Sequence, residues 1–427
     1  MDNYNQQFSE QQSFDMHEIG NPVPPKKQKS RFGLGFLVGA LVGAAVILIG
    51  VVVYSFITYR KMVDIYSGAK TYEYATYQEK LETIMEYLEL YYIGEVDEEE
   101  LRDGLSEGLL SGIDDKYAKY YTKEEFDRMM EDSSGEYCGI GVSITQDESG
   151  AIVVYKVFKG TPAEEADIHP MDVIIEAAGE RNFADLDALV ALVRGEEGTT
   201  IDLVVLRDGE EIPITVQRRK IVTPSIESKM LDDHIGYIAI SEFDRATVTQ
   251  FNDAITELEE AGMEALIIDV RDNPGGDYDS VVAMADRVLP KGTIITTKNK
   301  QGTVKEEVSD DEHQLTIPMV VLVNANTASA AELFSGAIQD YGLADIVGQQ
   351  TYGKGVVQSI YRLNDGSGMK FTTETYYTPS GRSVDGEGVI PDYEVELPDE
   401  VYEDGIVTEE EDVQLQKAIE LLGGGQE

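Results

Sequence analysis

The stretch MVVLVNANTASAAELFSGAIQDY, residues 319–341, combines an apolar run, a polar turn and a second apolar pattern. The run at 319–323 predicts a strand with both faces covered, because it has no polar residue in alternate positions. The spacing of Leu333, Ala337 and Tyr341 predicts a helix after the turn. A strand that leads directly into a helix is the repeating unit of α/β proteins, so this stretch indicates the fold class.

The same alternation continues on the amino-terminal side of this stretch. Apolar runs predict strands at 235–240 and 265–270, and apolar positions at helical spacing predict helices at 248–258 and about 277–289. A strand is also expected at 356–363. The alternation of strands and helices from 235 to 323 predicts a mostly parallel core in an α/β layer.

Residues 137–219 have a different pattern, with short strands and brief helices. The expected elements are strands at 151–158, 172–178, 201–206 and 212–216, and a helix at 186–193. Asp208-Gly209 joins the last two strands, which is a strong signal for a hairpin turn. We therefore expect a small β-rich module of about 80 residues, a size common for single domains. Before it, an apolar stripe predicts helix from 72 to about 130.

The amino-terminal residues divide into a polar tail, 1–31, and a span without charge, 32–59. The tail is too polar to order itself by burial. As a helix, the span would be roughly 42 Å long, enough to cross a bilayer core of about 30 Å. A cleaved signal peptide normally has an apolar core of only about 7–15 residues. We therefore expect an uncleaved membrane anchor.

The charges beside the span predict its orientation. Four basic residues precede it within six positions, whereas only Arg60 and Lys61 follow directly. This bias places the amino terminus in the cytoplasm and the bulk of the chain outside the cell membrane, as a single-pass protein. Gly35, Gly39 and Gly43 share one helix face and would permit close helix packing, so a homodimer is one hypothesis.

The chain carries a formal net charge of −47, all of it after residue 59. Such a surface repels phosphate backbones and excludes nucleic acid as an expected partner. A single cysteine, Cys138, rules out an internal disulfide framework and a thiolate cluster for a metal. No metal or organic cofactor is expected.

Ser329 is a candidate nucleophile because it lies where the buried strand turns into the helix. Backbone amides are unpaired at a helix start and the helix dipole is positive there, which suits an oxyanion. The alternative is a capping box, in which Ser329 and Glu332 only satisfy amides at the start of the helix.

A nucleophilic serine needs a base, and two kinds of residue could supply it. Lys354 lies between two glycines at the start of a strand, where desolvation would favour its neutral form. The alternatives are an ordinary surface lysine, or a Ser–His–Asp triad. The four histidines, none at a convincing position, are His17, His169, His234 and His313.

The turn Asp269-Val-Arg-Asp-Asn-Pro-Gly-Gly276 follows another expected buried strand. Its glycines permit unusual backbone dihedrals and expose amides, so the turn could donate a hydrogen bond to an oxyanion. An ordinary strand–helix turn is the alternative.

Residues 81–422 resemble the C-terminal processing peptidases, also called tail-specific proteases. Besides Arg271-Asp-Asn-Pro-Gly-Gly276, the matching motifs are Asn324…Ala-Ser329-Ala-Ala-Glu332, Gly353-Lys354-Gly355-Val-Val-Gln358, Tyr377-Thr-Pro-Ser-Gly-Arg382 and Gly388-Val-Ile-Pro-Asp392. The resemblance implies a crotonase-like α/β protease core, Ser329 as nucleophile, Lys354 as base and Gln358 as the residue that orients the lysine. Oxyanion donors would be the amides of Ala330 and of Gly275 or Gly276.

Residues 137–219 resemble a PDZ domain, inserted ahead of the protease core. Gly139, Ile140, Gly141 and Val142 match the loop that receives a peptide carboxylate. Asp167 and Met171 stand where the family usually has glycine, so the turns there could differ. Arg194 resembles an arginine that links peptide binding to activity in some relatives, although an arginine at a helix end is also simply a favourable charge.

These patterns predict a membrane-anchored serine endopeptidase that cleaves proteins near exposed C termini, with tail recognition by the PDZ domain. The expected parts are a disordered cytoplasmic tail (1–31), a transmembrane anchor (32–59), a helical segment (60–136), the PDZ-like domain (137–219), the protease domain (220–400) and an acidic segment with a short helix (401–427). A tethered PDZ adaptor with a silent protease domain is one alternative. A crotonase-like acyl-CoA enzyme is another, although no basic patch for CoA phosphates is evident.

Overall fold

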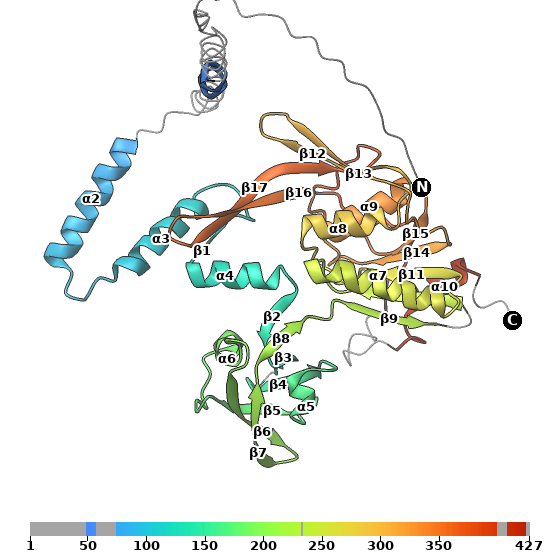
Figure 1. Cartoon of the computed structure of the whole chain (residues 1–427), viewed down its shortest axis with the longest axis horizontal. Coiled ribbons are helices and arrows are strands. Elements are labelled where there is room, and N and C mark those ends of the chain that lie inside the picture. The colour runs from blue at the N-terminus through green and yellow to red at the C-terminus, as the bar shows by residue number, and fades with distance from the viewer. Residues whose placement is uncertain (1–47, 57–73, 148, 232–233, 399–407, 424–427) are drawn as a thin grey trace, which may run out of the picture. The chain divides into compact units, whose positions relative to one another are not determined.

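The computed structural model describes residues 48–56, 74–147, 149–231, 234–398 and 408–423 (Figure 1). The chain divides into two compact units, Met1–Val96 and Asp97–Glu427. The first contains helix α2 (Tyr74–Tyr91). The second contains every element from α3 (Glu98–Ser111) onward and is the part that holds the candidate site.

The prediction of a membrane-spanning helix at 32–59 is wrong for the part of the chain that the structure describes. Of that span, only 48–56 are described, and they are helical. No helix among the described residues has the length and apolar character that a bilayer crossing requires. The tail at 1–31 and the glycines behind the homodimer hypothesis lie outside the described residues.

A six-stranded sheet forms the centre of the second unit, in the order β18-β15-β14-β11-β10-β9. Its parallel strands are β10 (Ile235–Ile240), β11 (Ala265–Asp269), β14 (Met319–Val323), β15 (Ala344–Gly348) and β18 (Tyr393–Glu394). Only the edge strand β9 (Ile226–Met230) runs antiparallel. Every residue of β11 and β14 is buried, which confirms the expectation of strands covered on both faces.

Helices cover both faces of this sheet. On one face lie α7 (Arg245–Glu260), α8 (Tyr278–Asp286) and α9 (Ala330–Asp340), and on the other lies α10 (Val413–Leu421). Because side chains alternate along a strand, Val321 and Val323 join the core beneath α9, whereas Val320 and Leu322 pack with Leu415 of α10. The α/β core inferred from strand–helix alternation is therefore present.

A second, five-stranded sheet lies beside this core. It contains β1 (Lys119–Tyr121), β17 (Gly368–Tyr377), β12 (Gly292–Asn299), β13 (Val304–Ser309) and β16 (Val356–Arg362). Strand β1 interrupts the segment that the sequence pattern predicts as helical up to residue 130. Tyr120 and Tyr121 are buried there by pairing with β17, and Thr122 then begins α4 (Lys123–Asp132) with a capping box.

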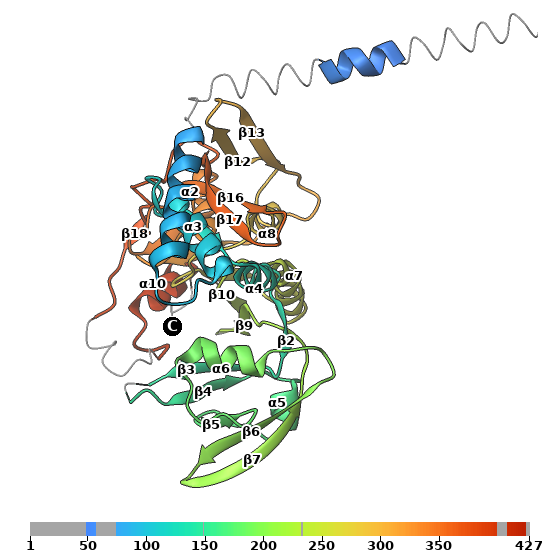
Figure 2. The same cartoon turned by 90° about the vertical axis from the view of Figure 1, so that its left-hand side faces the viewer.

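The small module has its own five-stranded sheet and its own core. The strands, in sheet order, are β3 (Val142–Gln146), β4 (Ile152–Val157), β5 (Val173–Ala177), β6 (Thr200–Arg207) and β7 (Glu210–Gln217), with helices α5 (Pro162–Glu165) and α6 (Leu186–Val193). Ile174, Leu189 and Leu203 are buried within it. Strands β2 (Glu136–Gly139) and β8 (Arg219–Val222) pair with each other where the chain enters and leaves the module (Figures 1 and 2).

Two turns of the module adopt a backbone conformation that favours glycine, although neither turn has a glycine at that position. Asp167 has φ 60° and Met171 has φ 73°, both in the left-handed region. A side chain there costs roughly 1–2 kcal/mol. Asp167 and Met171, at positions where the PDZ family usually has glycine, therefore strain these turns, but the turns keep the left-handed conformation.

Candidate active site

Ser329 lies at the junction between β14 and α9 in a strained conformation. Its φ of 55° and ψ of −114° fall outside the regions that residues with a side chain normally occupy. Such strain costs about 1–3 kcal/mol and persists only where surrounding contacts enforce it. The contacts that hold this turn are therefore central to the site.

Hydrogen bonds hold the Ser329 backbone from both sides. Its N–H donates to Glu332 Oε2 at 2.8 Å, and its carbonyl accepts from the Glu332 N–H and from the Tyr376 hydroxyl, each at 3.0 Å. Ser329 and Glu332 have the capping-box arrangement that the sequence predicts, with the Ser329 side chain facing the Glu332 N–H, but that N–H donates to the Ser329 carbonyl at 3.0 Å. Ser329 Oγ is therefore available for chemistry.

The Pro-Gly-Gly turn packs directly against this serine. A Cβ atom added to Gly275, whose φ is 104°, would lie 2.8 Å from the Cβ of Ser329, so only glycine fits there. The Gly275 N–H donates to Asn273 Oδ1 at 2.8 Å and is already occupied. By contrast, the amides of Gly276 and Ala330 have no acceptor within the described chain. These two amides are the free donors beside Ser329.

Side-chain amides join the two turns to each other. Asn324 and Asn326 donate through Nδ2 to Asp272 Oδ1 at 2.9 and 2.8 Å, and the Asp272 N–H donates back to Asn324 Oδ1 at 3.0 Å. In addition, the Ala328 N–H donates to the carbonyl of the buried Asn273 at 2.9 Å. The free donors and Ser329 therefore belong to one hydrogen-bonded framework.

Lys354 lies in the loop before β16 and is half-buried. Its Nζ lies 4.5 Å from the centroid of the Tyr117 ring, which belongs to the chain just before β1. Burial lowers the pKa of Lys354 below its ordinary value, and the positive charges of Lys370 and Lys116 act in the same direction. Glu332 and Asp115 oppose the shift in pKa but do not cancel it. The surroundings therefore make the neutral amine easier to form than it is in water.

Glu332 connects the serine to the lysine, which sequence reasoning missed because it considered Glu332 only as a cap. The carboxylate is fully buried. Its Oε2 accepts from the N–H groups of both Ser329 and Lys354, at 2.8 and 2.7 Å, and its Oε1 accepts from Gly353 N–H at 2.6 Å and from the Thr351 hydroxyl. One carboxylate oxygen thus fixes the backbone of two residues that are 25 positions apart in the sequence.

Gln358 and the histidines are the other candidate residues, and their positions relative to Ser329 and Lys354 differ. Gln358 makes long hydrogen bonds, 3.4 Å to Thr372 Oγ1 and 3.5 Å to the Val356 carbonyl, and no hydrogen bond within the described chain joins it to Lys354. None of the described histidines lines the cavity around Ser329. His17 lies outside the described residues. Lys354 is therefore the basic residue that shares this cavity with Ser329 and has a lowered pKa.

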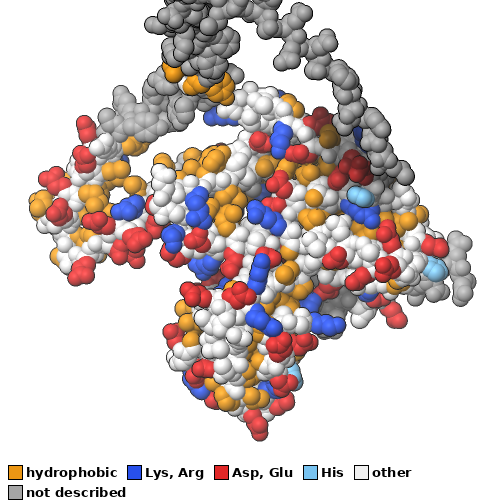
Figure 3. All heavy atoms as spheres, viewed as in Figure 1, with side chains coloured by type: hydrophobic (Ala, Val, Ile, Leu, Met, Phe, Trp, Pro, Cys, Tyr) orange, Lys and Arg blue, Asp and Glu red, His pale blue; other side chains and the backbone are white. Residues whose placement is uncertain are grey.

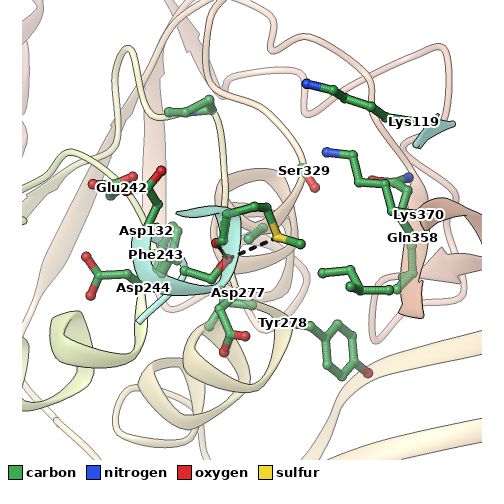
Figure 4. Close-up of a pocket in the computed structure, with 18 of the residues that line it drawn as sticks. Lys119, Asp132, Glu242, Phe243, Asp244, Asp277, Tyr278, Ser329, Gln358 and Lys370 are labelled. Atoms are coloured by element: carbon green, nitrogen blue, oxygen red, sulfur yellow. Dashed lines mark hydrogen bonds between the residues drawn. The ribbon is translucent and has the colours of Figure 1, made fainter. Parts of the chain in front are cut away.

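A cavity of about 830 Å³ brings the candidates together. Ser329, Ala330, Gly276, Lys354 and Gln358 all line it. Figure 4 shows Ser329 between a group of carboxylates on one side and lysines with Gln358 on the other. The space is large enough for several residues of an extended peptide, since ligand pockets commonly measure about 300–1,000 Å³.

A second cavity, of about 400 Å³, lies in the small module between β3 and α6. Ile140, Gly141 and Val142 line it together with Val190 and Val193 of α6. Strand β3 is at the edge of its sheet, and the amides of Ile140 and Gly141 have no acceptor in the described chain. An apolar groove with free amides at an open sheet edge suits an extended peptide with a terminal carboxylate.

Arg194, at the end of α6, joins the small module to helix α4, which precedes it in the chain. Its Nη1 donates to Glu131 Oε2 at 3.1 Å and to Asp132 Oδ1 at 3.0 Å, both near the end of α4. The guanidinium also lies over the Tyr137 ring, 4.9 Å from its centroid. Arg194 lines both cavities, as do Asp132, Val190 and Glu242, so the two cavities adjoin.

Comparison with known proteins gives two family matches. The family described as Peptidase family S41 matches residues 234–395, and the PDZ domain family matches residues 138–217. A solved structure of an S41 protease from Bacteroides fragilis shares the fold, with a TM-score of 0.50 at 17% identity over 75% of this chain and 90% of that one.

Curated relatives match over most of their length. The chain is 34% identical to the "Probable CtpA-like serine protease" of Staphylococcus aureus (strain MSSA476), over 86% of this chain and 72% of the relative. It is also 34% identical to the carboxy-terminal processing protease CtpA of Bacillus subtilis, over 75% of this chain and 69% of the relative. The carboxyl-terminal-processing protease of Synechocystis shows 34% identity over 75% and 76%.

Proposed function

Because this chain belongs to peptidase family S41 and is a serine peptidase of the CtpA type, we propose that Ser329 is its nucleophile and Lys354 its general base. The observation that carries this proposal is the arrangement around Glu332. One buried carboxylate oxygen holds the strained Ser329 and the lysine with a lowered pKa at the same cavity.

The proposed reaction begins with proton transfer from the Ser329 hydroxyl to neutral Lys354 as Oγ attacks the peptide carbonyl. The resulting oxyanion accepts hydrogen bonds from the free amides of Ala330 and Gly276. Collapse of the intermediate releases the amine, which takes its proton from Lys354, and leaves an acyl group on Ser329. Water activated by Lys354 then releases the acid and restores the serine.

The resting structure requires one movement before this reaction. Lys354 Nζ lies over the Tyr117 ring, and no hydrogen bond joins it to Ser329. Catalytic hydrogen bonds are often long in free enzymes and tighten when substrate binds. We propose that a substrate displaces Nζ from the ring toward Oγ. We propose that Gln358 orients Lys354 in that closer position.

Glu332→Gln tests the bridge between the two residues. An amide replaces one acceptor oxygen with a donor that faces N–H groups, and each buried group left unpaired costs about 1–3 kcal/mol. We expect the free energy of unfolding to fall by about 2–4 kcal/mol and kcat to fall by at least about 100-fold, with a smaller change in KM. Steady-state kinetics at a temperature below the Tm of the variant measure kcat and KM, and denaturant titrations measure the free energy of unfolding.

The exposed carboxylate Glu312 provides the matched control for this substitution. Glu312→Gln should leave stability and kcat unchanged. A folded Glu332→Gln enzyme with normal kcat would show that the bridge does not position the reacting groups.

We further propose that the substrates are proteins cleaved near their C-terminal tails, and that the PDZ domain recognises those tails. The free amides of Ile140 and Gly141 support binding of a terminal carboxylate, and the apolar wall of α6 supports an apolar last side chain. The location of the catalytic domain outside the cytoplasm stays a prediction, since it depends on residues that are mostly outside the described chain.

Val190→Glu tests tail recognition by placing a negative charge in the groove. We expect the ratio of kcat/KM for a peptide with a free C terminus to that of its amidated form to fall toward one, because like charges repel in a partly desolvated groove. Asn182→Glu adds the same charge at an exposed position outside both cavities and should keep the wild-type ratio. An unchanged ratio in Val190→Glu would remove the groove from substrate selection.

A further inference from the structure

Two lysines from paired strands form one wall of the catalytic cavity. Lys119 of β1 and Lys370 of β17 are directly opposite each other in the antiparallel pairing, so their side chains lie on the same face of the sheet. Both line the cavity that contains Ser329. Figure 4 shows both side chains reaching toward the serine from the same side. The sheet pairing thus places two positive charges beside the candidate nucleophile.

Neither lysine has a carboxylate partner within the described chain, although the sequence has 81 acidic and 34 basic residues. Both ammonium groups lie over the Tyr121 ring, at 4.8 Å for Lys119 and 5.7 Å for Lys370, which offsets only part of their repulsion. Like charges directly opposite in a sheet are destabilising. The repulsion between the two ammonium groups therefore destabilises the folded protein, and an anion bound in the cavity would reduce this repulsion.

Among the described residues, no carboxylate that lines the cavity forms an ion pair with either lysine. Asp132, Glu242 and Asp244 lie on the other side of Ser329 (Figure 4). Glu125, which also lines the cavity, accepts the Thr122 N–H in the capping box of α4. Figure 3 shows acidic side chains over much of the visible surface and basic side chains gathered near β1 and α4. The two lysines and the carboxylates of Asp132, Glu242 and Asp244 therefore lie on opposite sides of Ser329.

We propose that Lys119 and Lys370 form a subsite that binds a carboxylate of the substrate next to the scissile bond. The carboxylate belongs to an Asp or Glu side chain or to the free C terminus of a short tail. Two ammonium groups supply six N–H donors that turn toward the two oxygens of such a group. The inference rests on the proposed function, because the subsite is defined by its position beside Ser329.

Two matched pairs of fluorogenic peptides test the subsite with the full chain. The two peptides of the first pair have either Glu or Gln next to the cleaved bond, and this position is tested first on one side of the bond and then on the other. The two peptides of the second pair end a few residues after the cleaved bond, with either a free or an amidated C terminus. We expect kcat/KM to favour the carboxylate member by about two- to fivefold, as for other exposed ion pairs. Raising the salt from about 0.05 to 0.5 M should reduce this preference, because exposed charges are screened.

Charge variants assign the preference to these lysines. Lys119→Gln should lower it, and the double variant Lys119→Glu/Lys370→Glu should reverse it, so that the Gln member and the amidated member are cleaved faster. Lys300→Gln is the control, since Lys300 is exposed and outside the cavity, and it should keep the preference. A response of only the Glu/Gln pair identifies a side-chain carboxylate, and a response of only the acid/amide pair identifies the C terminus.

The outcomes separate this inference from the proposed function. Equal cleavage within both pairs, or a preference that survives in the double variant, overturns the subsite while the peptidase assignment stands. An acid/amide preference that is lost in Val190→Glu but kept in Lys119→Glu/Lys370→Glu belongs to the PDZ groove and also overturns the subsite. A wild-type enzyme that cleaves none of these peptides removes both proposals.

Discussion

Ser329→Ala is expected to abolish peptide cleavage and to leave the protein folded. Removing the nucleophile of a serine protease lowers kcat by several orders of magnitude. The loss is on the order of 10⁶-fold in an enzyme whose nucleophile and base act as a unit. Stability should change by at most about 1 kcal/mol, the typical value for a lost helix cap. The reason is that the Glu332 N–H, which the Ser329 side chain faces in the capping box, also donates to the Ser329 carbonyl, a hydrogen bond that alanine keeps.

Cleavage of an unstructured reporter protein, followed by gel and mass spectrometry, measures the activity, and thermal unfolding measures the fold. Ser111→Ala, an exposed serine on α3, is the control and should match the wild type in both. A serine-directed covalent inhibitor should label Ser329 alone. Normal cleavage by Ser329→Ala would reject the nucleophile. Inactivity with gross unfolding would instead support the capping box.

Lys354→Arg is expected to be inactive at every pH at which the protein is folded. A guanidinium group stays protonated up to about pH 12 and cannot take the serine proton. The loss should reach at least about 10³-fold, because the base and nucleophile act as a unit. An active Lys354→Arg enzyme would reject the lysine as base, and a rate controlled by a group titrating near pH 6.5 would then indicate a histidine.

The wild-type enzyme should show a matching pH dependence. Only the neutral amine acts as base, so the rate should rise with pH through one deprotonation. Because burial and the neighbouring Lys370 lower the pKa of Lys354, that rise should lie below the ordinary value of 10.5. Removing the charge in Lys370→Gln should move the rise to higher pH, toward 10.5, whereas Lys300→Gln should not move it. A profile that does not shift in Lys370→Gln would assign the titration to another group.

Several features of the site were predictable from the sequence because they depend on neighbouring residues. The apolar run at 319–323 forms β14, and the pattern that follows forms α9, so Ser329 was correctly placed at a strand–helix junction. The small residues around it and the two glycines of the Pro-Gly-Gly turn are also local signals. The uncharged span at 32–59 shows the limit of such signals, since hydropathy alone led to the membrane helix that the described residues do not contain.

Other features depend on which segments meet in space. No local pattern predicted that β1 would pair with β17, about 250 residues later, and bring Lys119 opposite Lys370. The same pairing region brings Tyr117 over Lys354. Strand pairing over such distances is specified by the packing of whole faces, and a three-residue strand carries too little pattern to reveal its partner.

The sequence by itself therefore determined the α/β core, because periodicity is a property of consecutive residues. Through its resemblance to known families it also indicated the PDZ domain and Ser329 and Lys354 as the candidate pair, because motif spacing is read along the chain. Tertiary structure alone decided how Glu332 joins that pair and that the Gly276 amide is free while the Gly275 amide is occupied. Hydrogen bonds of this kind depend on the directions of individual groups after distant segments have packed. Those directions follow from burial and strand register, which only the folded chain defines.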